Sequence, residues 1–170
     1  MGALDSLRRE HEVILEVVGR MENAAKCREG DLPVRFLLAA VDFLHVFVDK
    51  NHHGKEEQAV FPMMRVNPAL AELAALLAEE HEEGRRLTTA LERLLQDSSG
   101  HAEFVATLHD YVQLIRDHVF KENELIFVAA EAEFSDTDAA ELARAFTVIE
   151  EDALGSDGLL RLLKGLEHIT

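Results

Sequence analysis

Two short stretches of this sequence carry the same pair of metal-binding residue types. His52 and Glu56 are four residues apart, and so are His118 and Glu122. On an α-helix this spacing places both side chains on one face, one turn apart. An imidazole and a carboxylate in that arrangement suit iron, manganese or zinc. Each stretch therefore predicts part of a metal site.

The two stretches also agree at neighbouring positions. They share a lysine directly before the glutamate, Lys55 and Lys121, and a phenylalanine five positions after it, Phe61 and Phe127. His53 also has a glutamate four residues later, Glu57, which defines a second register. We favour His52 with Glu56, because only that register aligns the lysines and the phenylalanines of the two stretches.

Two further histidines interrupt the apolar stripes of other segments. His11 and His81 each stand between two glutamates. A single histidine on such a stripe is more typical of a hydrogen-bonded core residue than of a metal ligand. Here, however, His11 precedes one His-x-x-x-Glu stretch and His81 precedes the other, and the two stretches lie 66 residues apart. This internal repeat places all four histidines in one predicted ligand set.

The composition favours a helical protein that does not bind nucleic acid or membranes. Among 170 residues there are no tryptophans, one tyrosine and three prolines, and 48% are hydrophobic. Leucine, alanine and glutamate are frequent, and these residues favour helices. A net charge of −16 repels phosphate backbones and anionic lipids. A single cysteine, Cys27, cannot form an intramolecular disulfide, so we expect a cytoplasmic protein.

The elements that must position these residues are predicted from apolar periodicity. We expect four long helices over about 4–27, 32–64, 69–96 and 101–131, joined by short turns. Such helices form an all-α, antiparallel up-down four-helix bundle. We assign residues 1–134 to this bundle and residues 135–170 to a helical extension. The two helices of the extension should pack on the bundle or form a homodimer contact.

The pattern as a whole resembles the hemerythrin-like family, which is named for its His-His-Glu cation-binding motif. The resemblance covers about residues 4–130 and rests on Glu10-His11, His52-x-x-x-Glu56, Glu80-His81 and His118-x-x-x-Glu122 in order. It implies a non-haem centre of two iron ions bridged by an oxo or hydroxo group, with manganese or zinc less expected. By resemblance, one iron is bound by His11 and His52, the other by His81 and His118, and the bridges are Glu56 and Glu122.

The sequence departs from the oxygen-carrying members of that family at two positions. Those members have a second histidine on the third helix, where this chain has Arg85, and a last aspartate where it has Asn123. One iron would therefore lack an imidazole, so either it is more open or another group replaces the ligand.

Several nearby residues are candidates for this replacement or for supporting roles. The candidate substitutes for the absent ligand are His53, Glu57 and Tyr111. Arg85 could pair with a carboxylate such as Glu82 or direct its charge at an iron-bound anion. Asp49, three residues before His52, could accept a hydrogen bond from that imidazole.

These observations favour a di-iron protein that binds or senses oxygen or reacts with peroxide. The sequence leaves open whether the protein turns over peroxide in the way that a catalase or peroxidase does. No residue is assigned a catalytic role. One alternative is a nitric-oxide-response or iron-handling protein. Another is a bundle whose metal ions serve only to hold the helices together.

Overall fold

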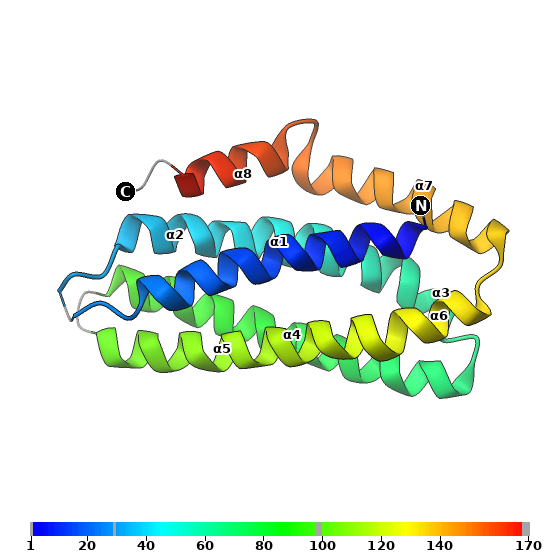
Figure 1. The fold of residues 1–170 in the computed structure, drawn as a ribbon, viewed down its shortest axis with the longest axis horizontal. Coiled ribbons are helices and arrows are strands. Elements are labelled where there is room, and N and C mark those ends of the chain that lie inside the picture. Colours follow the sequence, from blue (N-terminus) through cyan, green and yellow to red (C-terminus); the bar gives the residue numbers. More distant parts are fainter. Residues whose placement is uncertain (1, 29, 98–99, 168–170) are drawn as a thin grey trace.

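The computed structural model describes residues 2–28, 30–97 and 100–167, and within these ranges the protein is all-α. Four antiparallel helical rods form a bundle, and two further helices lie along one side of it (Figure 1). The predicted fold class is confirmed. The domain boundary near residue 134 stays a prediction.

Each rod of the bundle is one continuous helical path, although two rods change their helix type along the way. The first rod is α1 (Ala3–Ala24) and the third is α4 (Pro68–Gln96). The second rod runs through α2 (Val34–Phe43), η1 (Leu44–His53), η2 (Glu56–Val60) and α3 (Phe61–Met64). The fourth rod runs through α5 (His101–Lys121), η3 (Glu122–Ile126) and α6 (Phe127–Glu133).

The segments η1, η2 and η3 are π-helical, with wider turns than the sequence periodicity predicted. η2 begins at Glu56 and η3 begins at Glu122, so the internal repeat extends to the backbone. η1 has no such counterpart, because the equivalent part of the fourth rod, 66 residues later, is α-helical. Single π turns inside α-helices are frequent at functional sites, since they change the direction of the side chains that follow.

The apolar interior of the bundle consists of two clusters. One includes Ile14, Phe43 and Tyr111, and the other, nearer the opposite end of the bundle, includes Leu7, Phe61 and Phe127. Burial of each large apolar side chain contributes about 1.5–3 kcal/mol to folding. Two apolar clusters rather than one leave room for a buried polar layer within the bundle.

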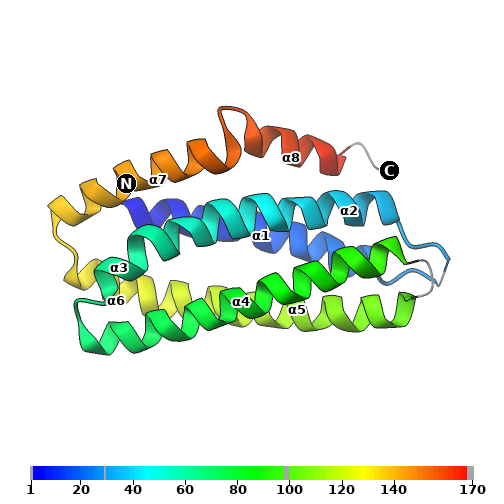
Figure 2. The same ribbon diagram turned by 180° about the vertical axis from the view of Figure 1, so that it is seen from behind.

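The C-terminal helices α7 (Asp136–Leu154) and α8 (Gly158–Glu167) pack on the second rod, and α7 also touches α1 (Figure 2). Ser135 caps α7 by accepting a hydrogen bond from the Asp138 backbone N–H, and Gly155 ends the helix at a φ of 65°. Leu142 and Phe146 of α7 join the second apolar cluster. None of the described helices is both long enough and apolar enough to cross a membrane.

Candidate metal centre

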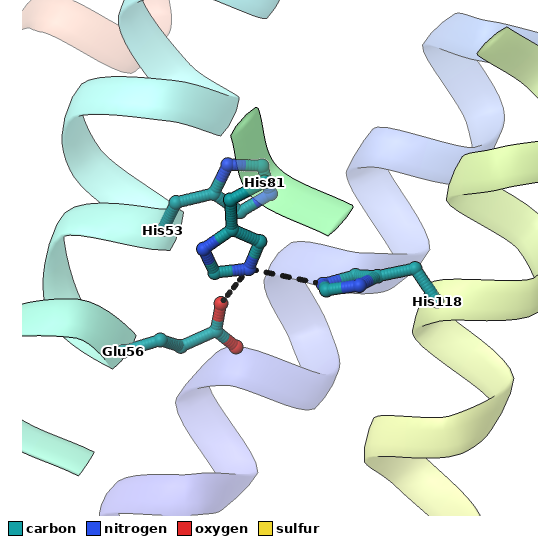
Figure 3. A group of neighbouring side chains, drawn as sticks. All are labelled: His53, Glu56, His81 and His118. Carbon is teal, nitrogen blue, oxygen red and sulfur yellow. Dashed lines mark hydrogen bonds and ion pairs between the residues drawn. The ribbon is translucent and has the colours of Figure 1, made fainter. Parts of the chain in front are cut away.

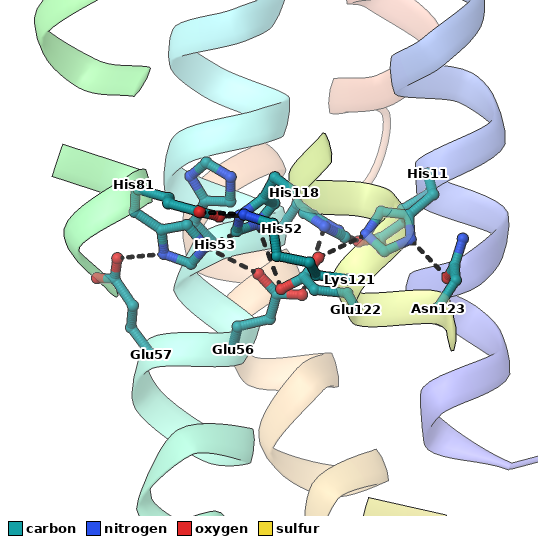
Figure 4. Close-up of polar contacts among 12 residues, drawn as sticks. His11, His52, His53, Glu56, Glu57, His81, His118, Lys121, Glu122 and Asn123 are labelled. Carbon is teal, nitrogen blue, oxygen red and sulfur yellow. Dashed lines mark hydrogen bonds and ion pairs between the residues drawn. The ribbon is translucent and has the colours of Figure 1, made fainter. Parts of the chain in front are cut away.

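All six residues predicted as metal ligands lie together in one buried layer of the bundle (Figure 4). Every rod contributes at least one of them. None exposes more than 2% of its surface, and the set is His11, His52, Glu56, His81, His118 and Glu122. Buried imidazoles and carboxylates lose their hydration, so each needs a partner that replaces it.

The two glutamates lie between the histidine pairs. Glu56 directs Oε1 to His52 Nε2 at 3.5 Å and Oε2 to His81 Nε2 at 3.4 Å. Glu122 directs Oε2 to His11 Nε2 at 3.0 Å and Oε1 to His118 Nε2 at 3.3 Å. Each carboxylate therefore spans the two pairs, which is the arrangement that a bridging ligand needs.

Two groups of donor atoms are compact enough to hold a metal ion each. We call His11, His52, Glu56 and Glu122 the first pocket, and His53, Glu56, His81 and His118 the second pocket (Figure 3). Glu56 belongs to both. His53 thus joins the histidine pair that lacks an imidazole relative to the oxygen-carrying family members.

The wide turns of η1 account for the place of His53. Adjacent residues of an α-helix point about 100° apart, so two neighbouring histidines on α-helical turns would not both face the same layer. In the structure His52 and His53 are both buried and both reach the layer, at the end of η1. The structure therefore brings histidines of both registers into the layer, and His52 as a metal ligand stays a prediction.

The buried atoms of the layer fit a metal better than they fit each other. Polar atoms without a hydrogen-bond partner include Nε2 of His11 and His52, both ring nitrogens of His53, and both oxygens of Glu56 and Glu122. Some lie close in distance, as His11 Nε2 and Glu122 Oε2 do, but they are not aligned as hydrogen bonds. Unpaired buried polar groups are costly, and metal coordination would satisfy them.

Four histidines of the layer each have their second ring nitrogen, Nδ1, close to a side-chain oxygen outside the layer. His52 Nδ1 lies 2.9 Å from Glu10, and His118 Nδ1 lies 2.9 Å from Glu80. Lys55 and Lys121 donate to these same two glutamates.

The remaining pair follows the same rule with different acceptors. His81 Nδ1 lies 2.7 Å from Glu57, and His11 Nδ1 lies 2.9 Å from Asn123. An acceptor at Nδ1 fixes the tautomer and leaves Nε2 free to bind a metal.

The repeated phenylalanines also face the layer. Phe61 stacks on His81 with ring centres 5.5 Å apart, and Phe127 stacks on His11 at 5.6 Å. These contacts restrict the rotation of both imidazoles and exclude water from their faces. The phenylalanines that aligned the two sequence stretches are therefore part of the site.

The pKa values within the layer show which groups must lose a proton before they can bind a metal. Burial lowers the pKa of His52 to about 4, so this ring is neutral at neutral pH. Burial alone would lower the pKa of His118, but the charge of Glu122 and the hydrogen bond with Glu80 raise the pKa of this imidazole to about 9. Burial and the charge of Glu122 raise the pKa of Glu56 well above its usual value.

The structure also places the candidate supporting residues. Asp49 was a candidate acceptor for His52, but that acceptor is Glu10, and Asp49 pairs with Arg85 instead. Glu57 lies behind His81 as an acceptor rather than among the donors of either pocket. Tyr111 is buried in the first apolar cluster and hydrogen-bonds with Thr88.

Sequence reasoning missed the roles of Glu10, Glu80 and Asn123 as acceptors. The signal was present, because the repeat aligns Glu10-His11 with Glu80-His81, and Asn123 with Glu57. What the repeat could not show is that each acceptor serves a histidine of a neighbouring rod.

The family model described as Hemerythrin HHE cation binding domain matches residues 2–130. Uncharacterized proteins of Mycobacterium tuberculosis and Mycobacterium bovis are 24% identical to this chain over 166 residues. The alignment covers 92% of this chain and 64% of each relative, so the chain spans less than two thirds of their length. The whole buried layer falls within the family match, whereas α7 and α8 lie beyond it.

Proposed function

We propose that this chain is a non-haem di-iron protein that binds or reacts with oxygen or peroxide. The starting point is that the chain belongs to the hemerythrin HHE cation-binding domain family. One observation carries this proposal: two compact groups of His and Glu donors share Glu56. Two ions held by a shared carboxylate form a two-metal site of the kind used for redox and hydrolytic chemistry. When bound, a pair of irons supplies the capacity to exchange two electrons with one small oxidant.

The donor set supports iron as the proposed metal. Imidazole and carboxylate ligands without thiolate suit iron, and structural zinc sites are usually tetrahedral and closed. In our assignment His11 and His52 bind one iron, His53, His81 and His118 bind the other, and Glu56 and Glu122 bridge. Cys27 lies outside this set.

The burial of the layer limits what can react there. All seven donor residues expose 4% of their surface or less. A bulky organic substrate could not reach them without separating the helices, whereas oxygen, peroxide and nitric oxide are small enough. The first pocket has fewer imidazoles than the second, so we assign the binding of the small ligand to the first pocket.

The test is to load the protein with ferrous iron without air and then to expose it to oxygen or to peroxide. We expect about two irons per chain, the number that a bridged two-metal site holds. We also expect new near-ultraviolet and visible absorption bands when the iron is oxidised. The lifetime of these bands and the rate of peroxide loss then separate reversible binding from turnover. Binding of one zinc, or of no metal, contradicts the di-iron proposal.

A second candidate is a metal-dependent structural bundle, and the complete burial of the layer favours it. In that case the metals would only stabilise the helices. Substitution of Glu56 would then abolish folding, and the reduced iron-loaded protein would not react with oxygen or peroxide. The same loading experiment, followed by circular dichroism of a Glu56→Ala variant, separates the two candidates.

A further inference from the structure

A cationic side chain flanks the second pocket. Arg85 lies on α4 one turn after His81, so both side chains are on the same face of the helix. Its guanidinium contacts three carboxylates. Nε lies 2.6 Å from Asp49, one terminal nitrogen lies 2.6 Å from Glu57, and the other terminal nitrogen lies 2.7 Å from Glu82. The planar fork of arginine suits such multiple pairing, and a lysine could not reproduce it.

The contact with Glu57 links Arg85 to His81. Glu57 Oε1 accepts from the Arg85 guanidinium and lies 2.7 Å from His81 Nδ1. The same oxygen therefore connects the guanidinium to the imidazole. On its other side, the His81 ring directs Nε2 toward Glu56 and His118 (Figure 3). By fixing Glu57, Arg85 fixes the direction in which His81 presents its ligand atom.

The contact with Asp49 extends the link to His53. Asp49 lies one turn before His53 on η1, and its Oδ1 is 3.9 Å from His53 Nδ1. This is too long for a hydrogen bond, but the charge still acts on the ring. The His53 ring is also stacked on His81, with ring centres 3.7 Å apart and an interplanar angle of 10°. Arg85 thus reaches both members of a stacked pair of imidazoles.

The internal repeat shows that these residues occur together on one side only. His81 follows His11 by 70 residues, so the position equivalent to Arg85 is Leu15. An offset of 66 residues relates the second rod to the fourth and gives the other equivalents: Ile115 for Asp49, Val119 for His53 and Asn123 for Glu57. None of the four residues linked through Arg85 beside the second pocket is repeated at its equivalent position, which supports a shared role for them.

We propose that Arg85 is a positioning residue that, through Glu57 and Asp49, holds His81 and His53 as joint ligands of the metal in the second pocket. The proposal rests on the proposed function, because it assumes that the pockets bind metal. It gives Arg85 a role toward the second pocket and none toward the first.

The experiment compares Arg85→Gln with Arg86→Gln, using cobalt(II) as the metal probe. Arg86 is the matched control, because it is the next residue on α4, is exposed, and pairs with nearby Glu83. Cobalt(II) is titrated into the metal-free protein, and its visible absorption reports the ligands of each ion. Thermal unfolding of the metal-free variants, followed by circular dichroism, measures their stability.

We expect Arg85→Gln to bind one of its two cobalt ions about 10-fold to 100-fold more weakly, as when an outer partner of a metal ligand is lost. The spectrum of the other ion should not change. Arg86→Gln should titrate like the natural protein. Arg85→Lys keeps the charge but not the fork, so its affinity should lie between those of Arg85→Gln and the natural protein.

Three results distinguish the outcomes. If the natural protein binds two ions and Arg85→Gln binds them equally well, the role of Arg85 is refuted while the proposed function stands. If both arginine variants lose affinity alike, the effect comes from surface charge and the proposal is also refuted. If the natural protein binds no metal, the proposed function fails first, and the inference fails with it.

Discussion

The two pockets of the centre are built on the same plan but are supported differently. In both, a histidine of the second or fourth rod is held by a glutamate that also accepts from a lysine, as Glu10 holds His52 and accepts from Lys55. Among the described residues, the second pocket alone has a third imidazole, His53, and an arginine paired with the acceptor of one of its histidines. The difference shows that a repeated scaffold can present two chemically unequal groups of donor atoms when a few outer positions diverge.

The largest expected effect comes from removing what the two pockets share. Glu56→Ala deletes the one residue that belongs to both donor groups, so we expect loss of both irons. Iron per chain after dialysis measures it. The matched control is Glu124→Ala, which removes an exposed glutamate close to Glu122. Retention of even one tightly bound iron in Glu56→Ala contradicts a bridging role.

The next effect separates the pockets from each other. His53→Ala removes an imidazole from the second pocket only, so iron should fall from about two per chain to about one. His52→Ala should produce the same loss from the first pocket. The two variants should differ in the spectrum of the iron that remains. That iron should keep three imidazole ligands in His52→Ala and two in His53→Ala. Identical spectra would argue against unequal pockets.

The reverse change tests whether the wide turns of η1 are needed. Val119→His places an imidazole at the position equivalent to His53, but α5 is α-helical there. We expect no third imidazole in the first pocket and a loss of about 1–3 kcal/mol in stability, because a buried polar group is left unpaired. Denaturant unfolding and the cobalt(II) spectrum measure both. A gain of a ligand would show that helix type is unimportant.

A smaller effect distinguishes the two lysines. Lys55 is 1% exposed and pairs with Glu10 and Glu150, so Lys55→Met should destabilise the fold by about 3 kcal/mol because the carboxylate of Glu10 loses its cationic partner. Lys121 is 31% exposed and pairs with Glu80, so Lys121→Met should cost about 1 kcal/mol or less. Urea unfolding of the metal-free variants compares them. Equal losses would refute the difference in burial as the cause.

The last effect is a dependence of metal affinity on pH. His118, with a pKa raised to about 9, and Glu56, with a raised pKa, carry protons that a metal must displace. Affinity should therefore rise with pH up to about 9, by about tenfold per unit for each proton released. Calorimetric titration in buffers of different ionisation enthalpy counts these protons. Binding without proton release would contradict both shifts.

Much of this site could be predicted because its spacing repeats. His52 with Glu56 and His118 with Glu122 follow from helix periodicity, and the repeat added His11 and His81. The bundle followed from the same apolar stripes. His53 was one of three candidate substitutes for the absent imidazole, and the sequence could not single it out from Glu57 and Tyr111. Its place depends on a π-helical backbone, and periodicity rules assume α-helical turns. Outer acceptors such as Glu10 were missed because their partners lie on other rods.

One contact of α7 bears on where this chain can be truncated without disturbing the metal centre. Glu150 accepts from Lys55, Lys55 donates to Glu10, and Glu10 holds His52. The family match ends at residue 130, before α7 begins. A fragment trimmed to that boundary would keep every donor of both pockets, yet it would uncover Lys55 and remove Leu142 and Phe146 from the core. Sequence families can thus delimit a ligand set without delimiting the smallest piece that holds it in place.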